Sequence, residues 1–208
     1  RLILENEKNI KIRDLINYSF ILYKEQNFDF DIKKIQKELS EFILNRFKNY
    51  LKDKKIRHDI IETSIINFTI DDLHKIFKKS VVLNKNIKKE GSNVISIYKR
   101  SSKILLDEQK NINDLTGLAD KNLFKNEYEQ ALYKKIQHIR KYFTNNIRDE
   151  NYTESLKTLS SLKREVDDFF DNVIVNDEDK IIKKNRLELL KMLCTSFENY
   201  LNFSKIEI

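Results

Sequence analysis

The fold prediction starts from residues 31–54, DIKKIQKELSEFILNRFKNYLKDK. Apolar side chains recur in this stretch every three or four residues, which places them on one broad stripe of a helix. They are Ile32, Ile35, Leu39, Phe42, Ile43, Phe47, Tyr50 and Leu51. Lysines and glutamates fill the opposite face, as expected when one face of a helix meets a core and the other meets water. The stretch therefore predicts a long amphipathic helix.

The same spacing continues along most of the chain. It predicts further helices near residues 15–21, 58–67, 73–81, 94–106, 124–143, 151–169 and 177–201. Asn151 is expected to cap the start of one of them, and Asp177 to Asp179 place negative charge at the start of the last. The chain holds no proline and two glycines, so it is poor in the residues that turns between strands require. We expect an all-α helical bundle.

Two interruptions suggest how the bundle is divided. Gly91 marks either a break or a weak point in a longer helical hairpin, and the polar residues 111–120, which include Gly117, predict a linker. We expect a helical accessory region at residues 1–90 and a second bundle at residues 91–208. The chain opens on Arg1-Leu2-Ile3-Leu4-Glu5 without an initiator Met, so we expect it to be part of a longer protein.

Charge is concentrated in one window. Residues 75–110 carry ten basic and three acidic side chains, a net of +7, which equals the net charge of the whole chain. Within this window, Lys99, Arg100 and Lys103 are spaced to share one helix face, and Tyr98 adjoins them as a possible surface for stacking a base. A focused basic face attracts polyanions, whereas a solvated lysine face and a core tyrosine are the alternative.

No catalytic group emerges from the sequence. His58, His74 and His138 lie far apart, and two isolated glycines cannot form a phosphate-binding loop. Cys194 lies on an apolar stripe, which favours packing over catalysis, and a single cysteine fits a reducing, cytoplasmic compartment. No stretch approaches the roughly 20 apolar residues of a membrane span, so we expect no membrane partner. We expect no cofactor and no metal in this chain.

Longer motifs point to a family. Residues 166–175 read VDDFFDNVIV, residues 185–190 read NRLELL, and residues 98–105 read YKRSSKIL. These strings resemble the bacterial glycyl-tRNA synthetase β-subunit family, and the similarity covers nearly the whole chain. The C-terminal hundred or so residues resemble the helical DALR anticodon-binding domain of that family.

The resemblance implies a tRNA-binding part of a glycine–tRNA ligase. It implies that tRNA-Gly is the RNA partner and that the aminoacylation site belongs to an α subunit in an α2β2 assembly, together with ATP and Mg2+. The expected RNA contacts are Lys99, Arg100, Lys103 and Tyr98, with Arg46, Asn185 and Arg186 as weaker candidates. Arg186 could instead pair with Asp171 or Glu178, and Asn185 could bond the backbone. The alternative function is a helical module that docks the catalytic subunit without touching RNA.

Overall fold

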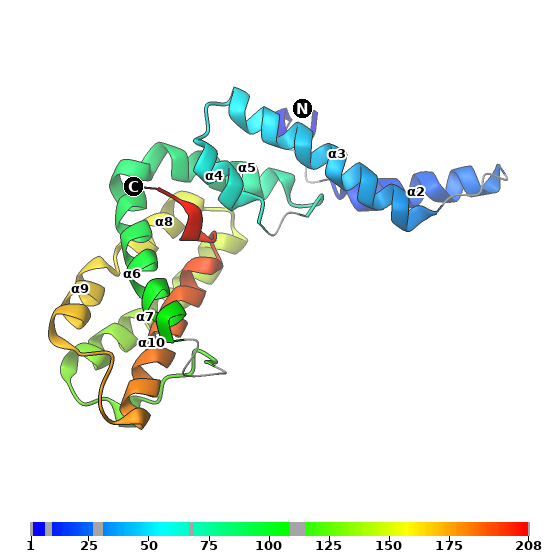
Figure 1. The fold of residues 1–208 in the computed structure, drawn as a ribbon. Coiled ribbons are helices and arrows are strands. Elements are labelled where there is room, and N and C mark those ends of the chain that lie inside the picture. The colour runs from blue at the N-terminus through cyan, green and yellow to red at the C-terminus, as the bar shows by residue number, and fades with distance from the viewer. Residues whose placement is uncertain (1, 7–9, 27–30, 67–68, 109–114, 208) are drawn as a thin grey trace. The chain divides into compact units, whose positions relative to one another are not determined.

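The computed structural model describes residues 2–6, 10–26, 31–66, 69–108 and 115–207 (Figure 1). Within these residues the regular structure is helical and no strand occurs, so the all-α prediction is confirmed. The chain forms two compact units, residues 1–84 and 85–208. The expected division between residues 90 and 91 falls inside the second unit. No helix in the described ranges is both long and apolar enough to cross a membrane.

The first unit contains α1 (Leu2–Glu5), α2 (Ile12–Glu25), α3 (Ile32–Asp53), α4 (His58–Ser64) and most of α5 (Leu73–Asn86). The helix predicted at residues 31–54 is α3, and the side chain of Asp31 caps it by accepting from the backbone N–H groups of Lys33 and Lys34 at 3.0 and 3.2 Å. The buried apolar side chains gather at the C-terminal end of α3 and on α4 and α5: Phe47, Leu51, Ile60, Ile61 and Leu83. None of the α2 residues is buried.

The second unit begins with a π-helix, η1 (Ile87–Gly91), which leads into α6 (Ser92–Glu108). The remaining elements are η2 (Lys121–Leu123), α7 (Glu127–Arg148), α8 (Tyr152–Ser160), α9 (Lys163–Asn172), α10 (Lys180–Glu198) and η3 (Phe203–Lys205). Helix α10 packs against both α6 and α7. Its residues 185–190 are all buried, which is the pattern of a helix enclosed on every side.

Local signals at the helix ends behave largely as the sequence predicts. Asn151 accepts from the Glu154 N–H at 3.3 Å, and Asp179 accepts from the Ile181 N–H at 2.8 Å. Near Gly91 the chain breaks from helical geometry at Lys89, whose φ and ψ are −116° and −108°. The suspected interruption is therefore real, and it lies two residues before the glycine.

The single helix expected over residues 151–169 is wrong, because the chain forms α8 and α9 there. The break falls at Ser161 and Leu162, where the Ser161 hydroxyl donates to the Thr158 carbonyl at 2.8 Å. Leu162 remains fully buried at the turn. The apolar spacing continues through the break, so periodicity could not reveal it.

Polar side chains of α10 hold the segment that precedes α7. Glu188 accepts from the backbone N–H groups of Thr116, Gly117 and Leu118 at 3.2, 2.5 and 3.2 Å. One turn earlier, Asn185 pairs with both backbone groups of Asp120 at 2.7 and 2.9 Å. A segment without regular structure leaves backbone donors unpaired, and these two side chains satisfy them in the interior.

Arg186 completes this arrangement as a buried ion pair. Its Nε donates to Glu129 at 2.7 Å, and its Nη1 donates to Asp177 at 2.6 Å and to the Ile174 carbonyl at 2.8 Å. The other oxygen of Glu129 accepts from the Lys125 and Asn126 N–H groups in a capping box that starts α7. We call Asn185, Arg186, Glu188 and Glu129 the polar clamp. The clamp ties α10 to the start of α7.

Gly117 is where this segment comes closest to α10. Its φ is +75°, a left-handed conformation that side chains other than glycine rarely adopt. A Cβ added there would lie 3.3 Å from the backbone nitrogen of Met192. Both the conformation and the close approach therefore require glycine.

We predict that Gly117→Ala lowers the free energy of unfolding by about 1–3 kcal/mol, through left-handed strain and contact with α10. Urea denaturation measures this change. The control is Leu118→Ala in the same segment, since Leu118 is 78% exposed and should tolerate truncation. Equal stability of the two variants would contradict the requirement for glycine.

We predict that Arg186→Met destabilises the fold by about 3–5 kcal/mol, because it leaves Glu129 charged and fully buried without its cation. Thermal and urea unfolding would show the loss. Arg164→Met is the matched control, because Arg164 is 87% exposed and its contact with Asp168 is long, at 3.7 Å. An Arg186→Met variant as stable as this control would argue against a structural role.

Candidate nucleic-acid interface

Helix α6 has a sharply divided surface. Its inner face buries Val94, Ile95, Ile97 and Tyr98 along with Ser101, and this face packs against α10. The outer face carries Arg100 and Lys103, which are exposed, and Lys99, which is half-buried. A spacing of three to four residues places these cations side by side. We call Lys99, Arg100 and Lys103 the α6 basic face.

The cations of this face are available to a ligand. Within the described ranges, none of the three forms an ion pair with a carboxylate. Neighbouring carboxylates are engaged elsewhere: Asp167 with Lys163, Asp168 with Arg164 at 3.7 Å, and Glu108 with Lys183 at 2.7 Å. The face therefore keeps its positive charge.

Arg100 is held in place by an aromatic ring. Its guanidinium carbon lies 4.1 Å from the centroid of the Phe170 ring on α9. A cation over a ring face is attracted by the ring quadrupole, and the contact restricts the side chain without consuming its N–H donors. Phe170 was not singled out in the sequence, because contact between α6 and α9 depends on the tertiary fold.

Tyr98 does not belong to the exposed surface, and its expected stacking role is a correction. Only 4% of the residue is accessible, and its ring packs against Phe197 and Phe203. Its hydroxyl donates to Glu198 at 3.0 Å. Burial, followed by the charge of Glu198, raises the pKa of Tyr98 well above its usual value. The helical register turns Tyr98 inward while its neighbours face out.

Asn185 and Arg186 likewise do not face solvent. Each is 5% exposed, and both belong to the polar clamp. The suggested partners of Arg186, Asp171 and Glu178, are replaced by Glu129 and Asp177. Donation from the Asp179 backbone N–H, and then from Arg186, lowers the pKa of Asp177. The expected RNA contacts at Asn185 and Arg186 do not fit this fold.

Arg46 lies in the first unit, on α3. It is exposed, and its guanidinium carbon sits 5.3 Å from the centroid of the Phe42 ring one turn earlier. Phe42 itself is 56% exposed. Arg46 is therefore accessible, but it belongs to a different unit from the α6 basic face.

The described residues contain no cluster of three or more His, Cys, Asp or Glu side chains able to hold a metal ion. Cys194 is buried in α10, and this burial, with the nearby Glu198, raises the pKa of its thiol to about 12. A thiol with so high a pKa carries almost no thiolate near neutral pH, which makes it a poor nucleophile.

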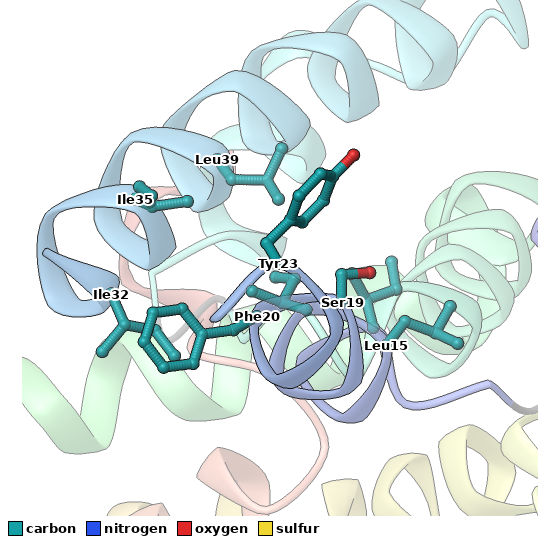
Figure 2. Close-up of a pocket in the computed structure, with 9 residues that line it drawn as sticks. Leu15, Ser19, Phe20, Tyr23, Ile32, Ile35 and Leu39 are labelled. Atoms are coloured by element: carbon teal, nitrogen blue, oxygen red, sulfur yellow. The ribbon is translucent and has the colours of Figure 1, made fainter. Parts of the chain in front are cut away.

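An apolar groove runs between α2 and α3 in the first unit (Figure 2). It encloses about 520 Å³, and its walls include Leu15, Phe20 and Tyr23 from α2 and Ile32, Ile35 and Leu39 from α3. Leu15 and Tyr23 are each 52% exposed. Contiguous apolar surface of this kind is typical of a site that another apolar surface covers.

Comparison with known proteins places these features in a family. Residues 94–208 match the model of the DALR anticodon binding domain. The chain is also 32% identical to the glycine–tRNA ligase beta subunit of Rickettsia peacockii, 33% to that of Rickettsia canadensis and 34% to that of Rickettsia felis. Each similarity covers 99% of this chain and 29% of the relative.

The matched segment begins inside α6 and includes the α6 basic face, the polar clamp and the whole of α7 to α10. The resemblance noted from the motifs is thereby confirmed. The chain belongs to the DALR anticodon-binding domain family, and over nearly its whole length it is related to glycine–tRNA ligase beta subunits.

Proposed function

We propose that the second unit binds the anticodon arm of tRNA-Gly and that the α6 basic face holds its phosphates. The observation that carries this proposal is the set of three adjacent cations on one outer helix face without a carboxylate partner among the described residues. The family match supports the same reading, since it identifies an anticodon-binding domain.

The physics of RNA binding suits such a face. Each phosphate that a lysine or arginine neutralises releases counterions, so affinity depends on the number of contacts and on salt. Arg100 adds geometry, because a guanidinium can donate two parallel N–H bonds to one phosphate. Its contact with Phe170 limits the freedom that would be lost on binding.

The role of the whole protein is part of the same proposal. This chain supports ATP-dependent glycylation of tRNA-Gly in the cytoplasm, while a partner α subunit in an α2β2 assembly holds the aminoacylation site, ATP and Mg2+. The relatives are named as beta subunits of a ligase, which favours a division of labour between subunits. The α6 basic face would grip the RNA rather than take part in chemistry.

We propose a second function for the first unit, namely docking of the catalytic subunit through the groove between α2 and α3. The groove combines an apolar lining with partly exposed large side chains, and α2 has no buried residue. An apolar helix of the partner would cover this surface in the helix-in-groove manner. Such docking, unlike phosphate binding, should depend little on salt.

We predict that replacing Lys99, Arg100 and Lys103 together with Gln weakens tRNA-Gly binding and flattens its salt dependence. The log–log slope of affinity against salt should fall by about 0.7–0.9 for every phosphate that the variant no longer neutralises. Filter binding over a series of salt concentrations measures both quantities. Stability should stay near wild type, because these side chains make no ion pair among the described residues.

The matched control replaces Lys33, Lys34 and Lys37 with Gln, which removes the same charge from exposed positions on α3. This control should retain the wild-type salt slope. Equal reductions in the two triple variants would mean that only total charge matters, and the proposal for α6 would be abandoned.

We predict that Leu15→Asp weakens association with the catalytic subunit by about tenfold or more, because it places a charge in an apolar contact. Tyr18→Asp is the control, since Tyr18 is 63% exposed on the same helix and does not line the groove. Surface-based binding measurements with the purified partner would compare the variants. Unchanged association of Leu15→Asp would exclude this groove as the docking site.

A further inference from the structure

A second groove, of mixed polarity, lies in the second unit between α7 and α8. It encloses about 520 Å³, within the range of about 300–1,000 Å³ typical of small-ligand sites. Helix α7 contributes His138, Tyr142 and Asn146 to its wall, and α8 with the residue after it contributes Thr158 and Ser161. We call this the α7–α8 groove.

The α7 residues of this groove form a stripe next to the core-facing one. Leu132, Ile136 and Phe143 point into the bundle, whereas His138 and Tyr142, four residues apart, point outward. Their ring centroids are 4.8 Å apart with planes tilted by 48°, and 54% of Tyr142 is exposed. The pair offers an accessible aromatic surface that the core does not use.

The polar atoms beside this surface are uncommitted. In the part of the chain that the structure describes, the His138 ring, the Tyr142 hydroxyl and the Asn146 amide make no hydrogen bond. Asn and Tyr side chains supply both donors and acceptors, which can match the edge of a planar heterocycle. The groove therefore offers stacking and directional hydrogen bonding together.

The charges around the groove argue for a base rather than a phosphate. Its two lysines are each paired: Lys157 with Glu154 at 2.7 Å and Lys135 with Glu165 at 3.6 Å. The local charge is thus balanced, whereas a phosphate site needs an excess of cations. A neutral aromatic ligand with polar edges suits a balanced groove lined by exposed rings.

We propose that an unpaired nucleobase of the bound RNA stacks on Tyr142 and His138 in the α7–α8 groove. This inference rests on the proposed RNA binding by the α6 basic face, and α8, which forms one wall, contacts α6 in the same unit. The stacking role that the sequence assigned to Tyr98 passes to Tyr142. Asn146 bonds the edge of the base, and its amide can read either donors or acceptors.

The test uses a tryptophan placed at the site, because the chain contains none. Tyr142→Trp keeps an aromatic surface, and its fluorescence should be quenched when a base stacks on it. The probes are an RNA hairpin with the sequence of the tRNA-Gly anticodon arm and a fully paired duplex of the same stem. We expect saturable quenching by the hairpin, with a Kd equal to that from filter binding, and little by the duplex. Tyr18→Trp, on the first unit, should show no saturable quenching.

Removing the aromatic ring tests the energetic contribution. We predict that Tyr142→Leu, which keeps apolar bulk, weakens hairpin binding by about five- to 150-fold, the range found for loss of one stacked base. The salt slope should stay at the wild-type value, because the same phosphates are still neutralised. Circular dichroism should be unchanged, since the ring is largely outside the core.

The outcomes separate the two proposals. Normal, salt-dependent binding of the hairpin, without quenching of Tyr142→Trp and without weaker affinity in Tyr142→Leu, would refute the α7–α8 groove and leave the α6 basic face intact. Equal quenching by hairpin and duplex would also refute it, because paired bases cannot stack in a groove. If the wild-type chain bound neither RNA, both proposals would fall.

Discussion

The buried pair between Arg186 and Glu129 is the constraint on which the second unit depends. Two charges taken out of water are tolerable only when each is fully hydrogen-bonded, and here each has further polar partners besides the other. Because Glu129 also caps α7 while Asn185 and Glu188 hold the preceding segment, the clamp fixes the register between α7 and α10. A slip of either helix would leave a charge unpaired in the core.

This register determines what the surface displays. Helix α10 is enclosed, so α6 and α7 must each turn an apolar face toward it and a polar face outward. On α6 the outward face carries the cations, and on α7 it carries His138 and Tyr142. The proposed phosphate and base sites thus lie on rigid helices, which lose less conformational entropy on binding than mobile loops would.

The two units are suited to different ligands. The second combines uncompensated cations with a charge-balanced aromatic groove, features that match the backbone and the bases of RNA. The first offers an apolar groove in which Leu15 and Tyr23 are half-exposed, which matches a protein surface better than a polyanion. RNA binding and subunit docking therefore need not compete for the same residues.

By itself, the sequence determined the helical class, most helix positions, the caps at Asn151 and Asp179, and the outward placement of Arg100 and Lys103, because these follow from periodicity and local hydrogen bonding. Tertiary structure alone decided that Tyr98 packs inside, that Arg186 pairs with Glu129 across 57 residues of sequence, and that residues 151–172 form two helices. Tyr98 and Tyr142 look alike in sequence. Which of them faces the core depends on where α10 lies, and contacts between distant segments leave no periodic trace in the chain.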